Sequence, residues 1–444
     1  MKNLKHSKAR IKGGGKVIIL DTGAIINPEA EAMLQALHSR STGGLESHLK
    51  ILEKRGPENF MKNFYVGYGH KSIGDCGTIS IFIEGVSILV AKAIQDWPLY
   101  SGQESSTRYI DFKTQPFKNP AQVKQGEKIL ENWRKFYSQS LKPIVEHLKK
   151  KHPLKENESE KIYNKAIDAR SFDILRGFLP AGSTTNLAWH TNLRQAADKI
   201  MFLRHNPLEE VKNVADAIER ALIKAYPNSF SHKRYEKTEK FNKYFMEKEY
   251  YYHNSKCPDF KLTKNNIDEK LISKTLLRKR PPKTELPRQL TEAGDIQFEF
   301  LLDFGSYRDL QRHRSLTQRM PLLTNEISFE KWYLDELPKE VREKAIKLLK
   351  KQKEITNKLK ISKEEKQYYI PMGYNVSCRL TGGLPAWLYI IELRATCFVH
   401  PTLRKRAKQM AKALTKKFKY LKIHLDKEID RFDIKRGEQD IVLK

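Results

Sequence analysis

Two stretches far apart in the chain, QDWPLYSGQESSTRY at residues 95–109 and DLQRHRSLTQRMPLLT at residues 309–324, decide how the fold is interpreted. Each follows a strand-like apolar run, Ile79–Phe82 in the first case and Ile296–Leu302 in the second. Each ends in a cluster of polar, aromatic or basic side chains. The chain therefore looks like two divergent copies of one plan.

The later part of each half continues the parallel. A Leu-Pro step ends at Pro180 and an Ile-Pro step ends at Pro371. Each is followed by a predicted amphipathic helix and a Leu-Arg pair, 24 residues later at Arg204 and 23 residues later at Arg394. One such pair could arise by chance, but an ordered series of four matched features favours duplication.

Composition suits two large domains. With 444 residues, 39% hydrophobic and 31% charged, the chain has enough apolar material for sizeable cores, which excludes wholesale disorder. A Lys-, Tyr- and Asn-rich stretch ends in a basic run before Pro281-Pro282, which indicates a linker. We predict an N-terminal domain at 1–230 with a helical insert at about 113–165, a basic linker at 231–285 and a C-terminal domain at 286–444. A periodic apolar stripe predicts a helix from Leu403 to Leu421.

Sequence features also bear on location. No apolar run approaches the ~20 residues that span a bilayer, so we predict no membrane association. The basic N-terminus is followed by glycines rather than a long apolar segment, so a secretory signal is not expected. Four scattered cysteines form no pairing pattern, which indicates a reducing compartment. We predict a cytoplasmic protein.

The net charge of +30 attracts polyanions such as nucleotides, cofactor phosphates and nucleic acid. A lysine-rich proteome or a solvated helix face explains this charge equally well. Nucleic acid stays an alternative partner that the sequence does not favour, because no zinc finger, helix-turn-helix or RNP-type signature is present.

Three clusters could carry chemistry. The first is Arg312-His313-Arg314, which suits an anion because guanidinium groups match phosphate oxygens, although a surface turn that pairs with acids would look the same. The second, 104–109, combines a carboxylate, hydroxyls and Arg108, and could also be a helix cap. The third, 67–75, carries His70 and Ser72 between glycines that admit a ligand or simply form a turn. The chain has no dinucleotide fingerprint, phosphate loop, metal-ligand spacing or supported cysteine nucleophile.

Together these clusters resemble the flavin-dependent thymidylate synthases, the ThyX family, whose motif is R-H-R followed by a glutamate, a serine and R-Y. The motif looks divided between the halves. The second half has Arg312, His313 and Arg314, but Met320, Leu322 and Thr324 replace the later residues. The first half has Glu104, Ser106, Arg108 and Tyr109, but Asp96-Trp97-Pro98 replaces R-H-R.

Other family positions divide similarly. Arg176 matches an arginine four residues before the Leu-Pro proline, where the second half has Gln367, and Arg394 matches the late Leu-Arg arginine. Asp309 stands near where the family has a glutamine that reads the pyrimidine. Asn192 and Arg194 match an N-x-R step, and His70 with Ser72 matches an early H-x-T/S step.

The resemblance implies an α+β fold with two ThyX-like domains, each a mainly antiparallel twisted sheet packed with helices. It implies an FAD-dependent methyltransferase that converts dUMP to dTMP, with methylenetetrahydrofolate and NADPH as co-substrates and no metal. Complementary sets of residues imply composite sites between unlike halves, in a homodimer that forms a pseudo-tetramer.

The residue roles follow from the same resemblance. We expect catalysis from Arg394, Arg312 and Ser106; substrate binding by Glu104, Ser106, Arg108, Arg176, Arg312 and Arg394; and cofactor binding by His70, Ser72, Asn192, Arg194, Arg312, His313 and Arg314. The alternatives are another flavin- and folate-dependent pyrimidine-nucleotide enzyme, or a non-catalytic basic protein that binds nucleic acid.

Overall fold

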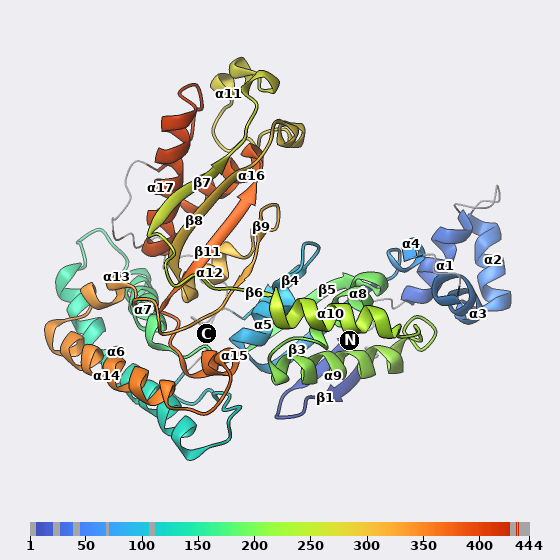
Figure 1. Cartoon of the computed structure of the whole chain (residues 1–444), viewed down its shortest axis with the longest axis horizontal. Coiled ribbons are helices and arrows are strands. Elements are labelled where there is room, and N and C mark those ends of the chain that lie inside the picture. The colour runs from blue at the N-terminus through green and yellow to red at the C-terminus, as the bar shows by residue number, and fades with distance from the viewer. Residues whose placement is uncertain are drawn as a thin grey trace. The chain divides into compact units, whose positions relative to one another are not determined.

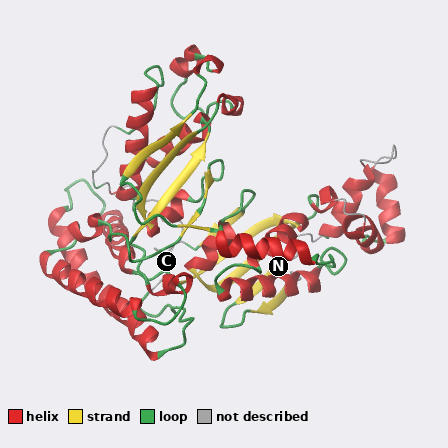
Figure 2. Ribbon diagram, viewed as in Figure 1, coloured by secondary structure: helices red, strands yellow, loops and turns green. Residues whose placement is uncertain are grey.

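The computed structural model describes residues 6–20, 27–38, 45–67, 71–105, 112–426, 432 and 434. The chain forms two compact units, each built from two segments. Unit 1 contains Met1–Tyr109 and Thr184–Tyr250, and unit 2 contains Ile110–Ser183 and Tyr251–Lys444. Both units combine an antiparallel sheet with helices (Figure 2), so the fold is α+β, as the sequence predicts.

Unit 1 is built on a five-stranded sheet in which every neighbouring pair is antiparallel. Its central strand shows why it forms, because Ile79, Ile81 and Ile83 are fully buried and alternate with more exposed residues. The strand order is β1 (His6–Arg10), β2 (Lys16–Leu20), β3 (Thr78–Ser87), β5 (Thr184–Asn192), β4 (Ser101–Glu104).

Helices of unit 1 pack on this sheet and on each other. The amphipathic α9 (Glu209–Ala225) contacts β1 and β2, and α5 (Ile88–Gln95) and α8 (Leu193–Leu203) pack beside it. The remaining helices are α1 (Pro28–His38), α2 (Leu45–Arg55), α3 (Glu58–Phe60), the π-helix η1 (Met61–Gly67), α4 (Lys71–Gly74) and α10 (Glu236–Lys248).

Unit 2 is built on a four-stranded antiparallel sheet of β7 (Phe260–Asn265), β8 (Ile296–Asp303), β11 (Asn375–Gly382) and β9 (Thr317–Gln318), in that order. In β8, Ile296, Phe298, Phe300 and Leu302 are buried and alternate with residues that are partly exposed. The helices α12 (Phe304–Leu310), α16 (Leu384–Arg394) and α17 (Pro401–Lys417) pack around this sheet (Figure 1).

The predicted C-terminal helix is present as α17, but it ends before Leu421. The backbone leaves helical geometry at Phe418, which has φ −115° and ψ 83°. Leu421 is nevertheless buried, and its N–H donates to Phe418 O at 2.9 Å in the turn that follows the helix.

A second group of helices completes unit 2. The long α6 (Lys124–Lys151) occupies the stretch where the sequence predicts a helical insert, and it packs against α7 (Glu160–Leu175) and α14 (Lys339–Asn357). Shorter elements are η3 (Arg176–Phe178), α13 (Lys331–Asp335), α15 (Lys363–Lys366), η6 (Gln367–Tyr369), η4 (Glu269–Leu271), α11 (Lys274–Lys279), η5 (Arg288–Ala293), and a parallel pair of β6 (Tyr251–Tyr252) with β10 (Met320–Pro321).

The two proline steps pair with each other inside unit 2. Pro180 and Pro371 form an antiparallel bridge. Backbone hydrogen bonds flank it on both sides: Met372 N donates to Leu179 O at 2.9 Å, and Ala181 N donates to Ile370 O at 3.0 Å. Matched segments that contact each other in this way resemble the self-complementary contact of a two-fold dimer.

No described helix is both long and apolar enough to cross a membrane.

Candidate active site

An N-cap and a turn place the Arg312-His313-Arg314 cluster at the end of α12. The Asp303 carboxylate accepts the Ser306 backbone N–H at 2.8 Å and caps the start of this helix. The helix ends at Leu310, and His313 N then donates to Leu310 O at 3.1 Å. This turn buries the His313 ring while the Arg312 side chain stays 54% exposed and Arg314 is also exposed.

Arg394, the last residue of α16, holds the His313 ring in place through a hydrogen bond. Its Nε donates to His313 Nε2 at 2.7 Å, and its Nη2 donates to the Asp309 carbonyl oxygen at 2.9 Å. Since His313 Nε2 accepts this bond, the imidazole proton lies on Nδ1. Burial and the Arg394 charge lower the pKa of His313 to about 3, so the ring is neutral at physiological pH.

The carboxylate of Asp309 stands among guanidinium groups from two parts of the chain. Burial opposes its ionisation, but the charges of Arg176, Arg312, Arg394 and Arg308 together lower the pKa of Asp309. Its Oδ1 lies 3.9 Å from Arg312 Nε. The cluster therefore holds one ionised carboxylate among several fixed positive charges.

Arg176 joins this cluster from η3, which follows α7. Its guanidinium is almost fully buried, and its Nη2 donates to Ser306 Oγ at 3.1 Å. Burial opposes the charge, but Tyr333 and the carboxylates of Asp173, Asp309 and Asp303 raise the pKa of Arg176. Within unit 2, the structure thus brings Arg176 together with the Arg312, His313 and Arg394 that the sequence singles out.

Several other predicted residues lie in unit 1 or outside the described residues. His70, Ser106 and Arg108 are outside them. Ser72 is exposed, Asn192 caps α8 by accepting Gln195 N at 2.8 Å, and Arg194 pairs with Asp75 at 2.7 Å. The hydrogen bond to Asp75 raises the pKa of Arg194.

Glu104, at the end of β4, has a structural partner. Its side chain is 2% exposed and its Oε2 lies 3.2 Å from Lys92 Nζ, which is fully buried. Gln95 Nε2 donates to the same oxygen at 3.0 Å. Because a buried carboxylate needs such a partner, this pair stabilises the position of β4 beside α5.

In the first half, the residues at the positions that match Arg394 and R-H-R make different contacts. Arg204 pairs with Glu219 at 3.1 Å and Glu239 at 3.2 Å, so two carboxylates cancel its charge. Lys199 Nζ donates to the Asp96 carbonyl oxygen at 2.7 Å, and burial lowers the pKa of Lys199 to about 8. Arg394, by contrast, makes its hydrogen bonds to a neutral imidazole and a carbonyl, with the Asp309 carboxylate as a further charged neighbour.

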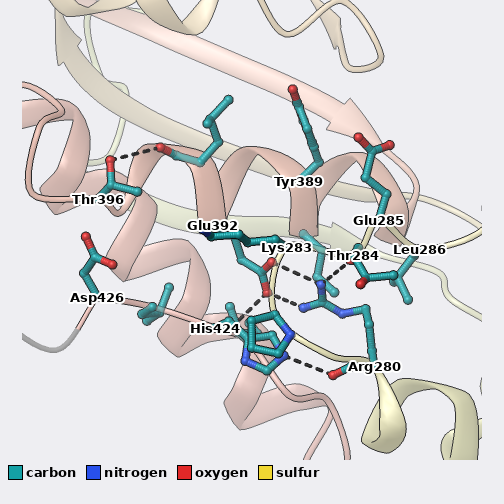
Figure 3. A pocket seen from close by; sticks show the side chains of 15 residues that line it. Arg280, Lys283, Thr284, Glu285, Leu286, Tyr389, Glu392, Thr396, His424 and Asp426 are labelled. Atoms are coloured by element: carbon teal, nitrogen blue, oxygen red, sulfur yellow. Dashed lines mark hydrogen bonds and ion pairs between the residues drawn. The ribbon is translucent and has the colours of Figure 1, made fainter. Parts of the chain in front are cut away.

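A cavity of about 690 Å³ lies beside α16 (Figure 3). Tyr389 of α16 lines it, and the ring of this tyrosine meets the His313 ring at a centroid distance of 5.9 Å. In the lining of the cavity, the buried Arg280 guanidinium and the Glu392 carboxylate pair with each other. This pair fastens the 280–286 segment to α16. No group of acidic, histidine or cysteine side chains among the described residues could hold a metal ion.

Sequence reasoning missed the side chains that surround Arg176, namely Ser306, Asp303 and Tyr333. A signal existed for two of them, because an aspartate three residues before a serine at the start of a helix is a capping pattern. Tyr333 lies 30 residues from Asp303 in the sequence and carried no signal.

Comparison with known proteins agrees with the motif-based interpretation. Residues 26–228 match the family model described as thymidylate synthase complementing protein. The chain is similar to this family over residues 26–228, a little under half of its length. The resemblance to ThyX is therefore confirmed for the first half of the chain, which includes Arg176.

Relatives extend the match over most of the chain. A UPF0159 protein of Chlamydia muridarum is 25% identical, over 80% of this chain and 78% of the relative. A UPF0159 protein of Chlamydia pneumoniae is 24% identical, over 81% of this chain and 78% of the relative. A UPF0159 protein of Thermoplasma acidophilum is 24% identical, over 88% of this chain and 92% of the relative. Their names state no activity.

Proposed function

We propose that the protein is a flavin-dependent thymidylate synthase that methylates dUMP to dTMP, using methylenetetrahydrofolate and NADPH. The observation that carries the proposal is the cluster around Asp309. Arg176, from the stretch that matches the family, and Arg312 and Arg394, from the second half, act on one carboxylate in one unit. Fixed guanidinium groups suit a phosphorylated pyrimidine that becomes electron-rich during the reaction.

A tandem copy accounts for the uneven distribution of these groups. The pairing of Pro180 with Pro371 supports it, and so do the packing of α6 on α14 and the repeated order of strand and helices in the two halves. In this proposal the complete site joins Arg312, His313 and Arg394 to Arg176, with Ser106 and Arg108 contributed by a first half. The reciprocal site is degenerate, because Glu219 and Glu239 neutralise Arg204. Two chains form a pseudo-tetramer.

The residues present also fit the flavin that the family implies. His313 is neutral and carries its proton on Nδ1, so it can donate to an electron-rich ring, and the exposed Arg312 and Arg314 can meet cofactor phosphates. The flavin, when bound, supplies the hydride that converts the methylene to a methyl group. Arg176, Arg312 and Arg394 hold the nucleotide in place and stabilise negative charge on its ring. We assign further cofactor contacts to His70, Ser72, Asn192 and Arg194.

Rescue of a thymidine-requiring bacterium tests the proposal. The intact gene should restore growth without thymidine, and Arg312→Ala should abolish rescue, because loss of one such contact costs roughly 2–5 kcal/mol of binding. Arg278→Ala is the matched control, since this arginine is exposed on α11 of the same unit. Rescue by Arg312→Ala, or by residues 1–230 alone, would contradict the composite site.

A second candidate is a flavin- and folate-dependent enzyme that acts on another pyrimidine nucleotide. The ionised Asp309 favours it, because a carboxylate only accepts hydrogen bonds and suits the 4-amino group of cytosine. Calorimetric titration with dUMP and with dCMP, followed by analysis of the nucleotide product, separates the two. Tighter binding of dUMP and a dTMP product would exclude the second candidate.

A further inference from the structure

The guanidinium of Arg176 is held by buried side chains that belong to none of the motifs above. We propose that Ser306, Asp303 and Tyr333 are positioning residues, which fix Arg176 for the nucleotide. This inference rests on the proposed function, in which Arg176 binds dUMP. It adds residues to the site that neither the sequence motifs nor the family match point to.

Ser306 makes the direct contact. Its Oγ is fully buried and accepts a hydrogen bond from Arg176 Nη2 at 3.1 Å. The same oxygen lies 3.2 Å from His400 Nδ1 and 2.8 Å from Thr402 Oγ1. Three neighbours at these distances leave the hydroxyl little rotational freedom.

The charged groups at the two ends fix the direction of the outer hydrogen bonds, because Arg176 only donates and Asp303 only accepts. His400 Nε2 faces the Asp173 carbonyl oxygen at 3.4 Å, and His400 Nδ1 lies 2.8 Å from Thr402 Oγ1. Thr402 donates its proton to the Asp303 carboxylate, which can only accept. The Ser306 proton can go to His400 or to Thr402, and either direction leaves an oxygen lone pair for Arg176, which can only donate.

Asp303 accepts hydrogen bonds from several members of this network. Its carboxylate is fully buried and accepts the Ser306 backbone N–H at 2.8 Å, the Tyr333 hydroxyl at 2.7 Å and the Thr402 hydroxyl. Burial raises the pKa of Tyr333 well above its usual value, so the phenol keeps the proton that it donates. The Asp303 charge also helps to keep Arg176 protonated.

Tyr333 holds the backbone beside Arg176 as well. A Cβ at Gly177 would lie 2.6 Å from the Tyr333 ring, so the ring rests directly on the backbone that follows Arg176. On the other side, Gly373 N donates to Gly177 O at 2.7 Å. Both the backbone and the guanidinium of Arg176 are therefore fixed before any ligand arrives. Its Nε is buried and has no hydrogen-bond partner among the described residues.

The test compares Ser306→Ala with Ser377→Ala. Ser377 is the matched control because it is a fully buried serine of unit 2 whose Oγ accepts one backbone N–H, from Asn254 at 2.9 Å. Calorimetry should show that Ser306→Ala weakens dUMP binding roughly tenfold, as expected for a lost hydrogen bond to a charged group. Flavin content and Tm should change no more than in the control. Tyr333→Phe should weaken dUMP binding in the same direction.

A double-mutant cycle makes the assignment specific. On an Arg176→Ala background, Ser306→Ala should weaken dUMP binding no further, because it acts through the guanidinium. Equal weakening with and without Arg176 would overturn the inference, and so would unchanged binding in Ser306→Ala.

A second readout does not depend on dUMP. The Arg176 Nε–H signal in NMR, assigned by its loss in Arg176→Lys, should exchange slowly with water and should exchange faster in Ser306→Ala. Equal exchange rates would overturn the positioning role even if dUMP binds. If dUMP does not bind the wild-type protein, the proposed function fails, while faster exchange in Ser306→Ala still supports the positioning role.

Discussion

Replacing Arg394 with methionine should raise the pKa of His313. In the wild-type protein the Arg394 Nε–H points at His313 Nε2 from 2.7 Å, so a proton on that nitrogen would meet another donor. Burial and this guanidinium together lower the pKa of His313 to about 3. Methionine keeps much of the length of the side chain and removes the charge. Burial, Arg312 and Arg314 still lower the pKa of His313 and Asp309 raises it, so the pKa should lie between 3 and its usual value of about 6.5.

The magnitude follows from linkage between protonation and folding. The pKa of His313 is about 6.5 in the unfolded chain and about 3 in the folded protein, so between these values the unfolded chain binds a proton that the folded protein does not. The stability that the neutral ring contributes is complete above pH 6.5, and falls by about 1.4 kcal/mol per pH unit as the pH drops toward 3. In Arg394→Met this loss of stability should end at a higher pH, because the pKa of His313 in the folded protein is higher.

NMR titration of the imidazole groups from pH 7 to the acid limit of folding is the assay, with His313 assigned by the loss of its signal in His313→Asn. The wild-type ring should stay neutral, with its proton on Nδ1, throughout the range in which the protein is folded. A pKa in Arg394→Met within about half a unit of the wild-type value would refute the reasoning, because burial would then explain the whole shift.

Two further predictions concern stability. Lys92→Met should lower the free energy of unfolding of unit 1 by roughly 3–5 kcal/mol, because it leaves the Glu104 carboxylate buried without the Lys92 cation. Urea unfolding measures this loss, with the exposed Lys240→Met as the control. An equal loss of stability in the two variants would contradict the prediction. Gly177→Ala should lower the stability of unit 2 by ~1–3 kcal/mol, because the new methyl group would lie 2.6 Å from the Tyr333 ring. If the variant unfolds in urea at the same concentration as the wild-type protein, the ring can move away without cost and the prediction is wrong.

Local motifs predicted part of the site well. The turn that buries His313 and exposes Arg312 is encoded within a few residues, because α12 ends at Leu310 and the chain reverses there. The strand pattern of Ile296–Leu302 likewise predicts β8. These features depend on neighbours in the sequence, so the sequence alone reveals them. Arg394 ends α16, which is apolar on all sides, with Tyr389 and Leu393 exposed, so the prediction that this helix is amphipathic is wrong.

Features that depend on tertiary packing were not predictable. Nothing in residues 110–183 shows that they fold with the C-terminal segment rather than with the strands before them. Glu104 fits a substrate-binding role by its motif, yet the buried Lys92 is its partner in the structure, and only the packing of β4 beside α5 reveals that. Tyr333 contacts Asp303 across 30 residues of sequence for the same reason.

The charges around Asp309 give the strongest argument for an anionic ligand. Four guanidinium groups, Arg176, Arg308, Arg312 and Arg394, act on its carboxylate, while Asp173, Asp303 and Asp309 act on Arg176. Among these seven groups the positive charges exceed the negative ones by one. Burial penalises this excess, since it lowers the pKa of Arg394 itself. A fold that needed only stability could replace Arg394 with an apolar residue, because exchanging buried charged groups for well-packed apolar ones is often neutral or stabilising. A protein that keeps the excess in a partly exposed cluster gains from it when a phosphorylated ligand binds, because the ligand then supplies the missing negative charge.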